Sequence, residues 1–532
     1  MAGRRQAAIA LGSNLGDRLG NLLAAVRALA ETDQVRQLSR LYESAPAYVT
    51  DQPPFLNAAA LVGTSLPPLE LLRRLKDIEA RLGRDLGPAA QRWGPRPIDL
   101  DIVFYEGQTV TEGETLVVPH PRWQERDFVK APLADLCSAG PGSSSGGGAS
   151  GSSSSSGGGA SGSRGGSSGS EAGTGQGGAA GDGGPAEFSA GGGSSSAGGG
   201  RGEAAGGGLQ RQLRLAASLW AAAGGERQLG TPDLECVLPM GRLGLWPWQR
   251  RTQVMGILNV TPDSFSDGGR HNGSVAAAVA HAAALAEAGA DILDIGGQST
   301  RPGSELLTAE QEKERILPVI RALMQEERLA RMPLSVDTFY ADVAAAAVEA
   351  GATMVNDVSG GTLDPGMHAQ VAELNVPYVL MHMRGTPQDM QQRRHTRYGD
   401  VVADVAAELA GAAQRATAAG IEPWRLVLDP GLGFAKTQQG NLQLMAQLPA
   451  LRAALPPPLG GLPLLLGPSR KGFLGKLTGR ERAADRDFAS AAAAALCVAG
   501  GANIIRAHNV EAVRDAVRVA DAVRPLLVPG LS

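Results

Sequence analysis

GSSSGGGASGSSSSSGGGASGS, residues 142–163, is the stretch that decides how this chain of 532 residues is organised. It belongs to a tract at 138–208 that consists almost entirely of Gly, Ser and Ala and has no apolar period. Ordering such a tract costs backbone entropy that no buried side chain offsets, so we predict a disordered linker. The linker separates a first segment, residues 1–137, from a second segment, residues 209–532, and each is long enough to form a core.

The overall composition indicates a soluble globular protein. Hydrophobic residues make up 43% of the chain, and the net charge of -4 gives no bulk attraction to nucleic acid or to an anionic membrane. The linker carries few charges, and these have both signs, which argues against an RNA-binding tail. No apolar run approaches the roughly 18 residues of a membrane span. We therefore predict neither nucleic-acid nor membrane partners.

The three cysteines, Cys137, Cys236 and Cys497, are far apart in the sequence. They offer neither a disulfide framework nor a paired metal site, which favours a reducing compartment. We predict a cytoplasmic location for the sequence as it stands, and a mitochondrial one if the natural chain begins further upstream.

The first segment alternates strand and helix signals. An apolar strand at 6–11 leads through a Gly-Ser-Asn turn into a helix at 19–30, and an amphipathic helix at 68–82 ends at Gly83. A basic loop then precedes a strand at 97–104, in which Asp99 and Asp101 lie on one face because successive side chains alternate. A solvated strand face is the simpler interpretation. The arginines just before the pair favour a magnesium site for a nucleotide instead.

Four motifs of the first segment form a spaced set: LGSNLGDR at 11–18, FLNAAA at 55–60, RWGPRPIDLDI at 92–102 and VPH at 118–120. The set resembles 6-hydroxymethyl-7,8-dihydropterin pyrophosphokinase. The resemblance implies a ferredoxin-like α+β domain in which Asp99 and Asp101 hold Mg²⁺ between ATP, the phosphoryl donor, and the pterin. Pterin-binding residues would be Ser44, Phe55, Asn57 and Phe128; ATP-binding residues would be Glu79, Arg84, Arg92, His120 and Arg126. Of these, Arg84, Arg92, Asp99 and Asp101 would be catalytic.

One departure from that family concerns the mobile catalytic loop. Many relatives have a further basic residue shortly after the position of Arg84, whereas Asp85 and Leu86 follow here. This raises the alternative of a binding module with weak turnover. For Phe55 and Phe128, ordinary core packing is the alternative that the residues alone favour.

The second segment begins with a predicted helix and hairpin at 209–250 that precede the main domain of residues 251–532. From there, apolar runs alternate with helical patterns over about 270 residues, which is typical of a (β/α)8 TIM barrel, with a doubly wound sheet as the alternative. The eight predicted strands are 254–259, 291–295, 334–337, 353–357, 378–382, 426–429, 464–467 and 503–508.

Polar residues stand at the C-terminal ends of these strands, and in a barrel this end forms the active face. Each residue alone has an ordinary structural interpretation, such as a helix cap or a loop ion pair. Together they form one group suited to a heterocycle and one suited to an anion. The first group contains Asp337, Asn356 and Asp429, and the second contains Arg301, Lys471, Arg506 and His508.

Seven motifs carry a second resemblance: MGILNVTPDSFSDGG at 255–269, DIGGQSTRPG at 294–303, SVDT at 335–338, NDVSGG at 356–361, LDPGLGFAK at 428–436, GPSRKGF at 467–473 and IIRAHNV at 504–510. The set resembles dihydropteroate synthase. The resemblance implies that Asp337, Asn356, Asp429 and Lys471 bind the pterin, and that Thr300, Arg301, Arg506 and His508 bind pyrophosphate with Asn259 and Mg²⁺. Phe434 and Ser469 would contact 4-aminobenzoate, and Lys471 and Arg506 would be catalytic. Gln298 stands where many relatives have Glu, an exchange to which we attach no consequence.

These observations predict a bifunctional folate enzyme. The first domain transfers pyrophosphate from ATP to hydroxymethyl dihydropterin, and the second condenses the product with 4-aminobenzoate, with magnesium and arginines absorbing the charge of the leaving group. A pterin-binding methyltransferase is the alternative for the barrel. Relatives of the barrel form dimers, so we expect a homodimer through this domain or a higher homo-oligomer. The linker predicts two independent halves on a loose tether of about 45 Å r.m.s. span.

Overall fold

The computed structural model describes residues 4–87, 91, 93–137, 203–231, 233–260, 271–299 and 306–527, without the side chains of 203–207, 227 and 271–274. Residues Met1–Ala139 and Gly202–Ser532 form one compact unit. Within it, the described residues form a mixed-order antiparallel sheet, a short two-stranded ribbon and a parallel barrel. The ribbon consists of β6 (Val110–Glu112) and β7 (Leu116–Val118).

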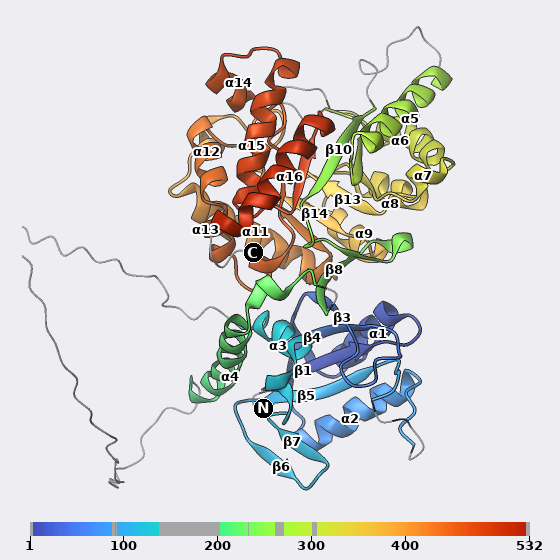
Figure 1. Ribbon diagram of the computed structural model, residues 1–532, viewed down its shortest axis with the longest axis vertical. Coiled ribbons are helices and arrows are strands. Elements are labelled where there is room, and N and C mark those ends of the chain that lie inside the picture. Colours follow the sequence, from blue (N-terminus) through green and yellow to red (C-terminus); the bar gives the residue numbers. More distant parts are fainter. Residues whose placement is uncertain are drawn as a thin grey trace, which may run out of the picture. The chain divides into compact units, whose positions relative to one another are not determined.

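The antiparallel sheet has the strand order β5-β1-β4-β3-β8-β9, with β2 also pairing with β4. Its strands are β1 (Arg5–Ser13), β2 (Gln34–Leu38), β3 (Leu41–Ser44), β4 (Phe55–Thr64), β5 (Asp99–Tyr105), β8 (Leu234–Pro239) and β9 (Leu245–Pro247). The first five come from before the linker and the last two from beyond it. Strand β8 lies beside β3, antiparallel to it (Figure 1).

Helices cover both faces of this sheet. On one face, α1 (Arg18–Ala30) and α2 (Pro68–Arg81) bury Leu22, Leu71 and Leu75 against the strands, because these apolar residues recur at helical spacing. The side chain of Asp17 caps the first turn of α1. On the other face lie α3 (Asp127–Ala134) and α4 (Glu203–Ala222). The arrangement confirms the predicted ferredoxin-like α+β domain.

The barrel strands run in the order β15-β14-β13-β12-β11-β10-β17-β16, all parallel, among the described residues. They are β10 (Gln253–Asn259), β11 (Ile292–Gly296), β12 (Leu334–Asp337), β13 (Met354–Asp357), β14 (Tyr378–Met381), β15 (Leu426–Asp429), β16 (Leu465–Leu466) and β17 (Ile504–Ala507). A bridge between Leu428 and Leu464 joins the two outer strands of this order, so the sheet closes. This confirms the TIM barrel and excludes the doubly wound sheet.

Helices surround the barrel strands as an outer layer (Figure 1). They are α5 (His271–Glu287), α6 (Ala309–Leu323), α7 (Glu327–Ala330), α8 (Ala341–Glu349), α9 (Met367–Leu374), α10 (Arg393–Thr396), α11 (Val401–Ala418), α12 (Gln438–Ala446), α13 (Leu448–Ala454), α14 (Gly472–Thr478), α15 (Asp487–Ala499) and α16 (Val510–Leu527). Thr308 and Gln311 form a capping box at the start of α6. No described helix is long and apolar enough to cross a membrane.

Candidate functional sites

The carboxylates of β5 lie beside two arginines. Asp99 accepts a hydrogen bond of 2.5 Å from Arg84 and one of 3.1 Å from Arg96. Burial acts to raise the pKa of Asp99, but the two arginines outweigh it and hold that pKa below its usual range. Burial and the neighbouring Asp99 both raise the pKa of Asp101. Arginines therefore neutralise the charge of Asp99, whereas Asp101 lies next to the negative charge of Asp99.

A cavity of about 90 Å³ adjoins these carboxylates. The cavity brings together seven of the residues predicted from the sequence: Ser44, Phe55, Asn57, Asp99, Asp101, Arg126 and Phe128. The amide of Asn57 donates a 2.9 Å hydrogen bond to the hydroxyl of Ser44, which fixes two polar groups in the wall. Two aromatic rings and an amide suit a flat heterocycle, and the two carboxylates suit a metal ion beside it.

Sequence reasoning missed further residues of this wall. Tyr48 and Trp93 stand with ring centroids 5.1 Å apart, and both line the cavity. Arg126 donates a 3.0 Å hydrogen bond to the Tyr48 hydroxyl, and the Arg122 guanidinium lies 4.7 Å from the centre of the Tyr48 ring. The signal for Trp93 was its place between arginines in RWGPR; Tyr48 carried no comparable signal.

The remaining predicted ATP-site residues are placed differently from one another. His120 lies 4.0 Å from Asp101, and burial lowers its pKa. Glu79 is fully buried: its Oε1 contacts Lys76 and Arg84 at 2.8 Å and accepts a 2.7 Å hydrogen bond from the backbone of Leu100. Glu79 is therefore placed to position Arg84 from within the core, and its expected role near ATP stays a prediction. Arg92 lies outside the described residues.

The donor set on β5 fits magnesium. Two hard carboxylates share one strand face next to a cavity, with a histidine at 4.0 Å. In the described part of the chain, no three His, Cys, Asp or Glu side chains converge on one point. The residues thus suit an ion held by two carboxylates and completed by phosphate oxygens, rather than a closed protein site.

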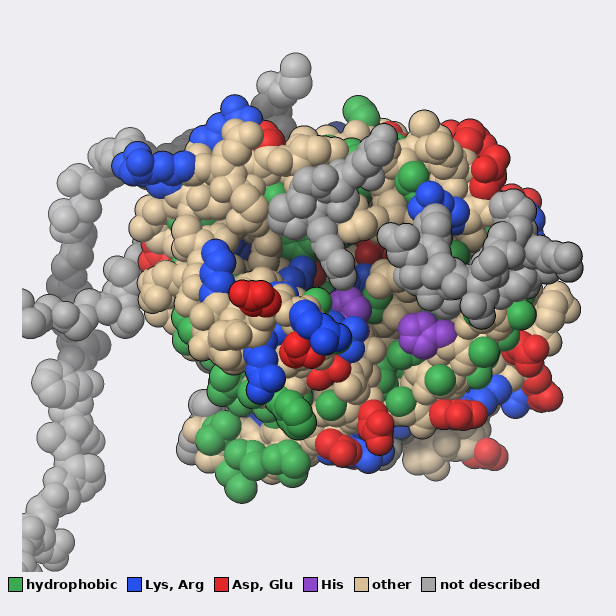
Figure 2. Space-filling view, turned by 90° about the horizontal axis from the view of Figure 1, so that it is seen from above, with side chains coloured by type: hydrophobic (Ala, Val, Ile, Leu, Met, Phe, Trp, Pro, Cys, Tyr) green, Lys and Arg blue, Asp and Glu red, His purple; other side chains and the backbone are tan. Residues whose placement is uncertain are grey.

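At the barrel, strands β10, β12, β13, β15 and β17 direct polar residues to their C-terminal ends. Figure 2 shows this face from above, with Lys, Arg, Asp, Glu and His side chains gathered near its middle. Arg506 donates 2.6 Å hydrogen bonds to Asp294 and to Asp337, and the amide of Asn356 donates to Asp294 at 3.2 Å. Three strands of the barrel are joined through one guanidinium.

Asp294 is a member of this cluster that the sequence analysis missed. It is fully buried within β11, where a charged residue in an apolar strand was the available signal. Burial raises the pKa of Asp337 to about 7, with Arg506 opposing the shift and Asp294 adding to it. Asp337 is therefore a largely buried carboxylate whose charge is balanced by the Arg506 guanidinium.

Asp429 lies at the end of β15 and accepts a 2.7 Å hydrogen bond from the backbone of Gly431. Burial raises its pKa to about 6. Near it, the buried ammonium of Lys436 contacts His382 Nδ1 and the carbonyl of Phe434 at 3.0 Å each. Burial lowers the pKa of Lys436 to about 7 and that of His382 to about 4. Lys436 was not predicted, although the quoted motif at 428–436 ends on it.

Four of the other predicted barrel residues form two pairwise contacts. The Lys471 ammonium lies 4.0 Å from the centre of the Phe434 ring. Ser469 Oγ and His508 Nδ1 are 3.0 Å apart. Asn259 ends β10, at the same face. Thr300 and Arg301 lie outside the described residues.

A buried polar network lies behind Asp337. Glu312 of α6 is fully buried, and its Oε2 accepts hydrogen bonds from Gln298 at 2.8 Å and from Thr338 at 3.0 Å. Burial raises the pKa of Glu312 to about 7. The amide of Gln298 thus has a defined role as a donor. A glutamate there would bring a second carboxylate to Glu312, so the residue type at 298 has a physical consequence that the sequence analysis did not assign.

Comparison with known proteins covers most of the chain. Residues 8–138 match the family described as 7,8-dihydro-6-hydroxymethylpterin-pyrophosphokinase, and residues 255–508 match the family described as pterin binding enzyme. Residues 139–254 lie outside both matched ranges.

Two relatives named as folate synthesis bifunctional proteins align along almost the whole chain. The chain is 41% identical over 519 residues to the mitochondrial folate synthesis bifunctional protein of Pisum sativum, which covers 97% of this chain and 88% of the relative. It is 39% identical over 520 residues to a folate synthesis bifunctional protein of Arabidopsis thaliana, covering 97% and 95%. Dihydropteroate synthase of Xanthomonas albilineans with 4-aminobenzoic acid, a solved structure, is 47% identical, with a TM-score of 0.49 over 55% of this chain and 99% of that one.

Taken with the two sites, these relatives show that the chain belongs to the family of bifunctional folate synthesis proteins, in which a hydroxymethyldihydropterin pyrophosphokinase and a dihydropteroate synthase share one polypeptide.

Proposed function

We propose a residue-level assignment for the two reactions of this bifunctional folate enzyme. The enzyme transfers pyrophosphate from ATP to 6-hydroxymethyl-7,8-dihydropterin and then condenses the product with 4-aminobenzoate to give 7,8-dihydropteroate. The observation that carries the first assignment is the convergence of Ser44, Asn57, Asp99 and Asp101 on one cavity. The second rests on the hydrogen bonds of Arg506 at the barrel face.

In the pyrophosphokinase, the pterin ring lies between Phe55 and Phe128, and Asn57 reads its edge. Asp99 and Asp101 would hold Mg²⁺, which would neutralise phosphate charge. Arg84, kept in place by Glu79, stabilises the charge that develops on the transferred group, together with Arg92, Arg126 and His120. The pterin hydroxyl loses its proton to water as its oxygen forms a bond to the β-phosphorus of ATP, the bond from that phosphorus to the oxygen bridging to the α-phosphate breaks, and AMP leaves with the electron pair.

In the synthase, Asp337, Asn356, Asp429 and Lys471 bind the pterin, and the pyrophosphate lies with Thr300, Arg301, Arg506 and His508. Asn259, at the end of β10, would help to hold Mg²⁺, which would offset the charge of the pyrophosphate. The bond from the exocyclic methylene carbon to oxygen breaks as pyrophosphate leaves with the electron pair, and the amine of 4-aminobenzoate forms the new C–N bond and loses a proton. Phe434 and Ser469 position the amine substrate. No protein nucleophile is required.

Two assays of the purified full chain test the assignment. With ATP, the hydroxymethyl pterin and Mg²⁺, it forms AMP; with 4-aminobenzoate added, it releases pyrophosphate and forms dihydropteroate. Intact ATP binding with no AMP would instead favour the binding-module alternative that Asp85 and Leu86 raised. Absence of pyrophosphate release from supplied pterin pyrophosphate would reject the synthase assignment.

We further propose a homodimer formed through the barrel. Large apolar side chains are exposed on two neighbouring helices of the barrel: Phe488 (90% exposed) and Leu496 (63%) on α15, and Val519 (65%) on α16. Exposed apolar groups in such numbers on adjoining helices are typical of a protein interface. A second copy of the same surface would cover them.

Compartment is a separate proposal. The cytoplasmic prediction stands beside the mitochondrial alternative, which the name of the Pisum sativum relative favours. Imaging of a fluorescent fusion made from the complete natural gene distinguishes the two.

A further inference from the structure

The helix that follows the linker packs on the pyrophosphokinase sheet. Leu209 and Leu213 of α4 are fully buried in one cluster with Phe104 of β5 and Leu133 of α3. They lie on the face of the sheet that α1 and α2 leave uncovered. Without α4, this apolar sheet face would contact water, at a cost of about 25 cal/mol per Å².

The strand that follows α4 extends the same sheet. Strand β8 pairs with β3 so that Leu234 stands opposite Ser44, and the backbone of Ala45 donates a 3.3 Å hydrogen bond to Asp233. Ser44 is the residue that accepts from Asn57 in the pterin cavity. The register of a cavity strand is thus set by a partner from beyond the linker.

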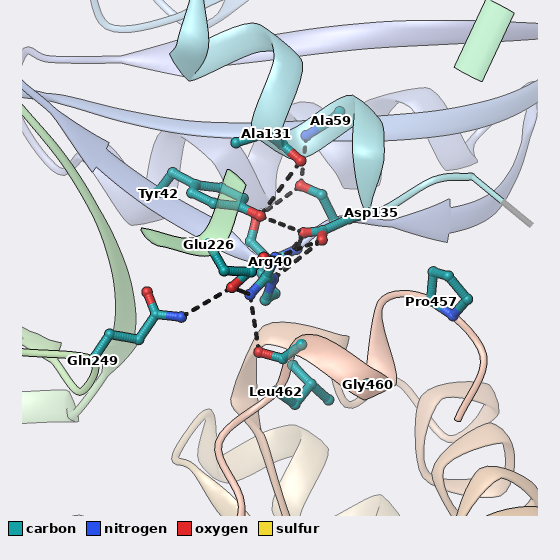
Figure 3. A network of polar contacts seen from close by, with 12 residues as sticks. Arg40, Tyr42, Ala59, Ala131, Asp135, Glu226, Gln249, Pro457, Gly460 and Leu462 are labelled. Carbon is teal, nitrogen blue, oxygen red and sulfur yellow. Dashed lines mark hydrogen bonds and ion pairs between the residues drawn. The ribbon is translucent and has the colours of Figure 1, made fainter. Parts of the chain in front are cut away.

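A buried ion network fastens the same junction (Figure 3). Arg40, which directly precedes β3, donates to Asp135 at 2.9 Å, to Glu226 at 2.6 Å and to the carbonyl of Gly461 at 3.0 Å. Tyr42 donates to Asp135 at 2.8 Å. One guanidinium therefore joins the first segment, the residues just beyond α4 and a loop of the barrel.

The ends of the linker also meet in the pyrophosphokinase. Leu136, close to where the tract begins, and Leu209, just after it ends, lie in the same buried cluster. Gly208 approaches Gly107 so closely that a Cβ on Gly107 would lie 2.6 Å from it. The chain leaves this domain and returns to it. This corrects the predicted boundary of two independent halves on a loose tether, because the tract connects two parts of one fold.

We infer that residues 209–247 are part of the pyrophosphokinase and complete its pterin site, so that the first 137 residues are an incomplete enzyme. Helix α4 is a positioning element that covers the sheet, and β8 is a positioning element that holds β3 and Ser44. The link to pterin rests on the site proposed above, whereas the packing of the two pieces does not depend on it.

The first experiment cuts the full chain inside the linker. A protease recognition sequence replaces residues 150–156, and the purified protein is cleaved and passed over a sizing column. We expect the two fragments to elute together and AMP formation to stay within about two-fold of the uncut enzyme, since the buried contacts outlast the cut. Separate elution of the fragments overturns the inference, whatever the activity.

The second experiment compares two leucines of α4. Leu213 is fully buried against the sheet, whereas Leu215 is 48% exposed on the same helix. In the cleavable chain, Leu213→Asp should release the fragments and lower AMP formation at least about 30-fold, because a buried unpaired charge costs several kcal/mol. Leu215→Asp should do neither. Dihydropteroate formation from supplied pterin pyrophosphate reports whether the barrel remains folded in both.

Three outcomes contradict the inference. AMP formation that survives in Leu213→Asp would show that α4 is dispensable for the pyrophosphokinase. Equal loss of both activities would assign α4 to the barrel or to the whole molecule. Equal effects of the two substitutions would show that burial on the sheet is irrelevant. Failure of both enzyme assays in the uncut protein, together with continued association of the fragments after cleavage, would count against the proposed function and leave the shared fold in place.

Discussion

The guanidinium of Arg506 donates a 2.6 Å hydrogen bond to the carboxylate of Asp337, across the face of the barrel. The sequence placed these two residues in different groups, one for the anion and one for the heterocycle. Their contact makes the two groups a single unit, and Asp294 extends it to a third strand. In the proposed assignment, one side chain therefore links the pyrophosphate-binding group to the pterin-binding group.

Arg506→Lys should lower kcat/KM of the synthase by at least about 30-fold, because lysine keeps the charge but loses the fork that joins two carboxylates. AMP formation by the same protein should stay unchanged and serves as the control. Steady-state kinetics with supplied pterin pyrophosphate measure the effect. A wild-type synthase rate in this variant would show that charge alone suffices.

Asp101→Ala should abolish AMP formation, because one of two carboxylates on the metal-binding strand face is removed. The synthase should retain its rate on supplied pterin pyrophosphate. The two rates are measured on one preparation. A matched Glu43→Ala variant, which alters a half-buried carboxylate on β3 of the same sheet, should keep both rates. Parallel loss of both activities in Asp101→Ala would mean that the substitution unfolds the shared structure.

Glu312 should make stability pH-dependent. Its pKa in the folded protein, about 7, lies above that of an unfolded glutamate, so the folded state binds its proton more tightly. The free energy of unfolding contributed by this group is greatest below about pH 4.5, falls as pH rises to about 7 and is constant above, a change on the order of 3 kcal/mol. Glu312→Gln should remove this slope. Urea unfolding midpoints of both proteins at pH 5 and pH 8 test it, and parallel shifts would refute the assignment.

Deleting residues 142–200 should leave both activities intact, because the tract joins two points of one domain. A loop about six-fold shorter lowers the entropy of closing it by about 1.5 kcal/mol, which should raise the melting temperature slightly. Differential scanning of the deleted and full chains, with both assays, checks this. Loss of AMP formation alone would indicate that the tract has a role of its own in that reaction.

Phe488→Asp combined with Leu496→Asp should convert the proposed dimer to a monomer, because each substitution places a charge in the apolar contact. Light scattering on a sizing column measures the mass. Leu477→Asp, which changes a half-exposed leucine on α14, is the matched control and should stay dimeric. A monomeric parent protein would dispose of the proposal directly.

The barrel was predictable because its signals are local. Each strand is an apolar run that ends in a polar group, and the observed bounds differ from the predicted ones by no more than a residue or two. The cavity residues Phe55, Asn57 and Phe128 followed from motif resemblance, and the structure brings them together. The burial of Glu79 was not predictable, because its hydrogen bond from the Leu100 backbone joins α2 to β5, and these elements meet only in the folded domain.

The local sequence pattern did not predict that the β8–β9 hairpin joins the pyrophosphokinase sheet. Every residue of β8 is buried, so no alternation marks which face belongs to which neighbour. Leu238 and Met240 lie in one cluster with Met255 and Ile292 of the barrel, whereas Val237 packs in the pyrophosphokinase core. A fully buried strand that packs against two domains has the same apolar sequence pattern as a strand that pairs only within its own hairpin.

That shared hairpin has a consequence for synthesis of the protein. On the ribosome, β3 emerges early, but its neighbour β8 emerges only after the whole glycine-rich tract has been translated. Until then the β3 edge carries unpaired backbone groups, which in other chains template wrong pairing. The nascent chain thus passes through a period in which the β3 edge is unpaired, and the time needed to translate residues 138–208 sets how long that period lasts.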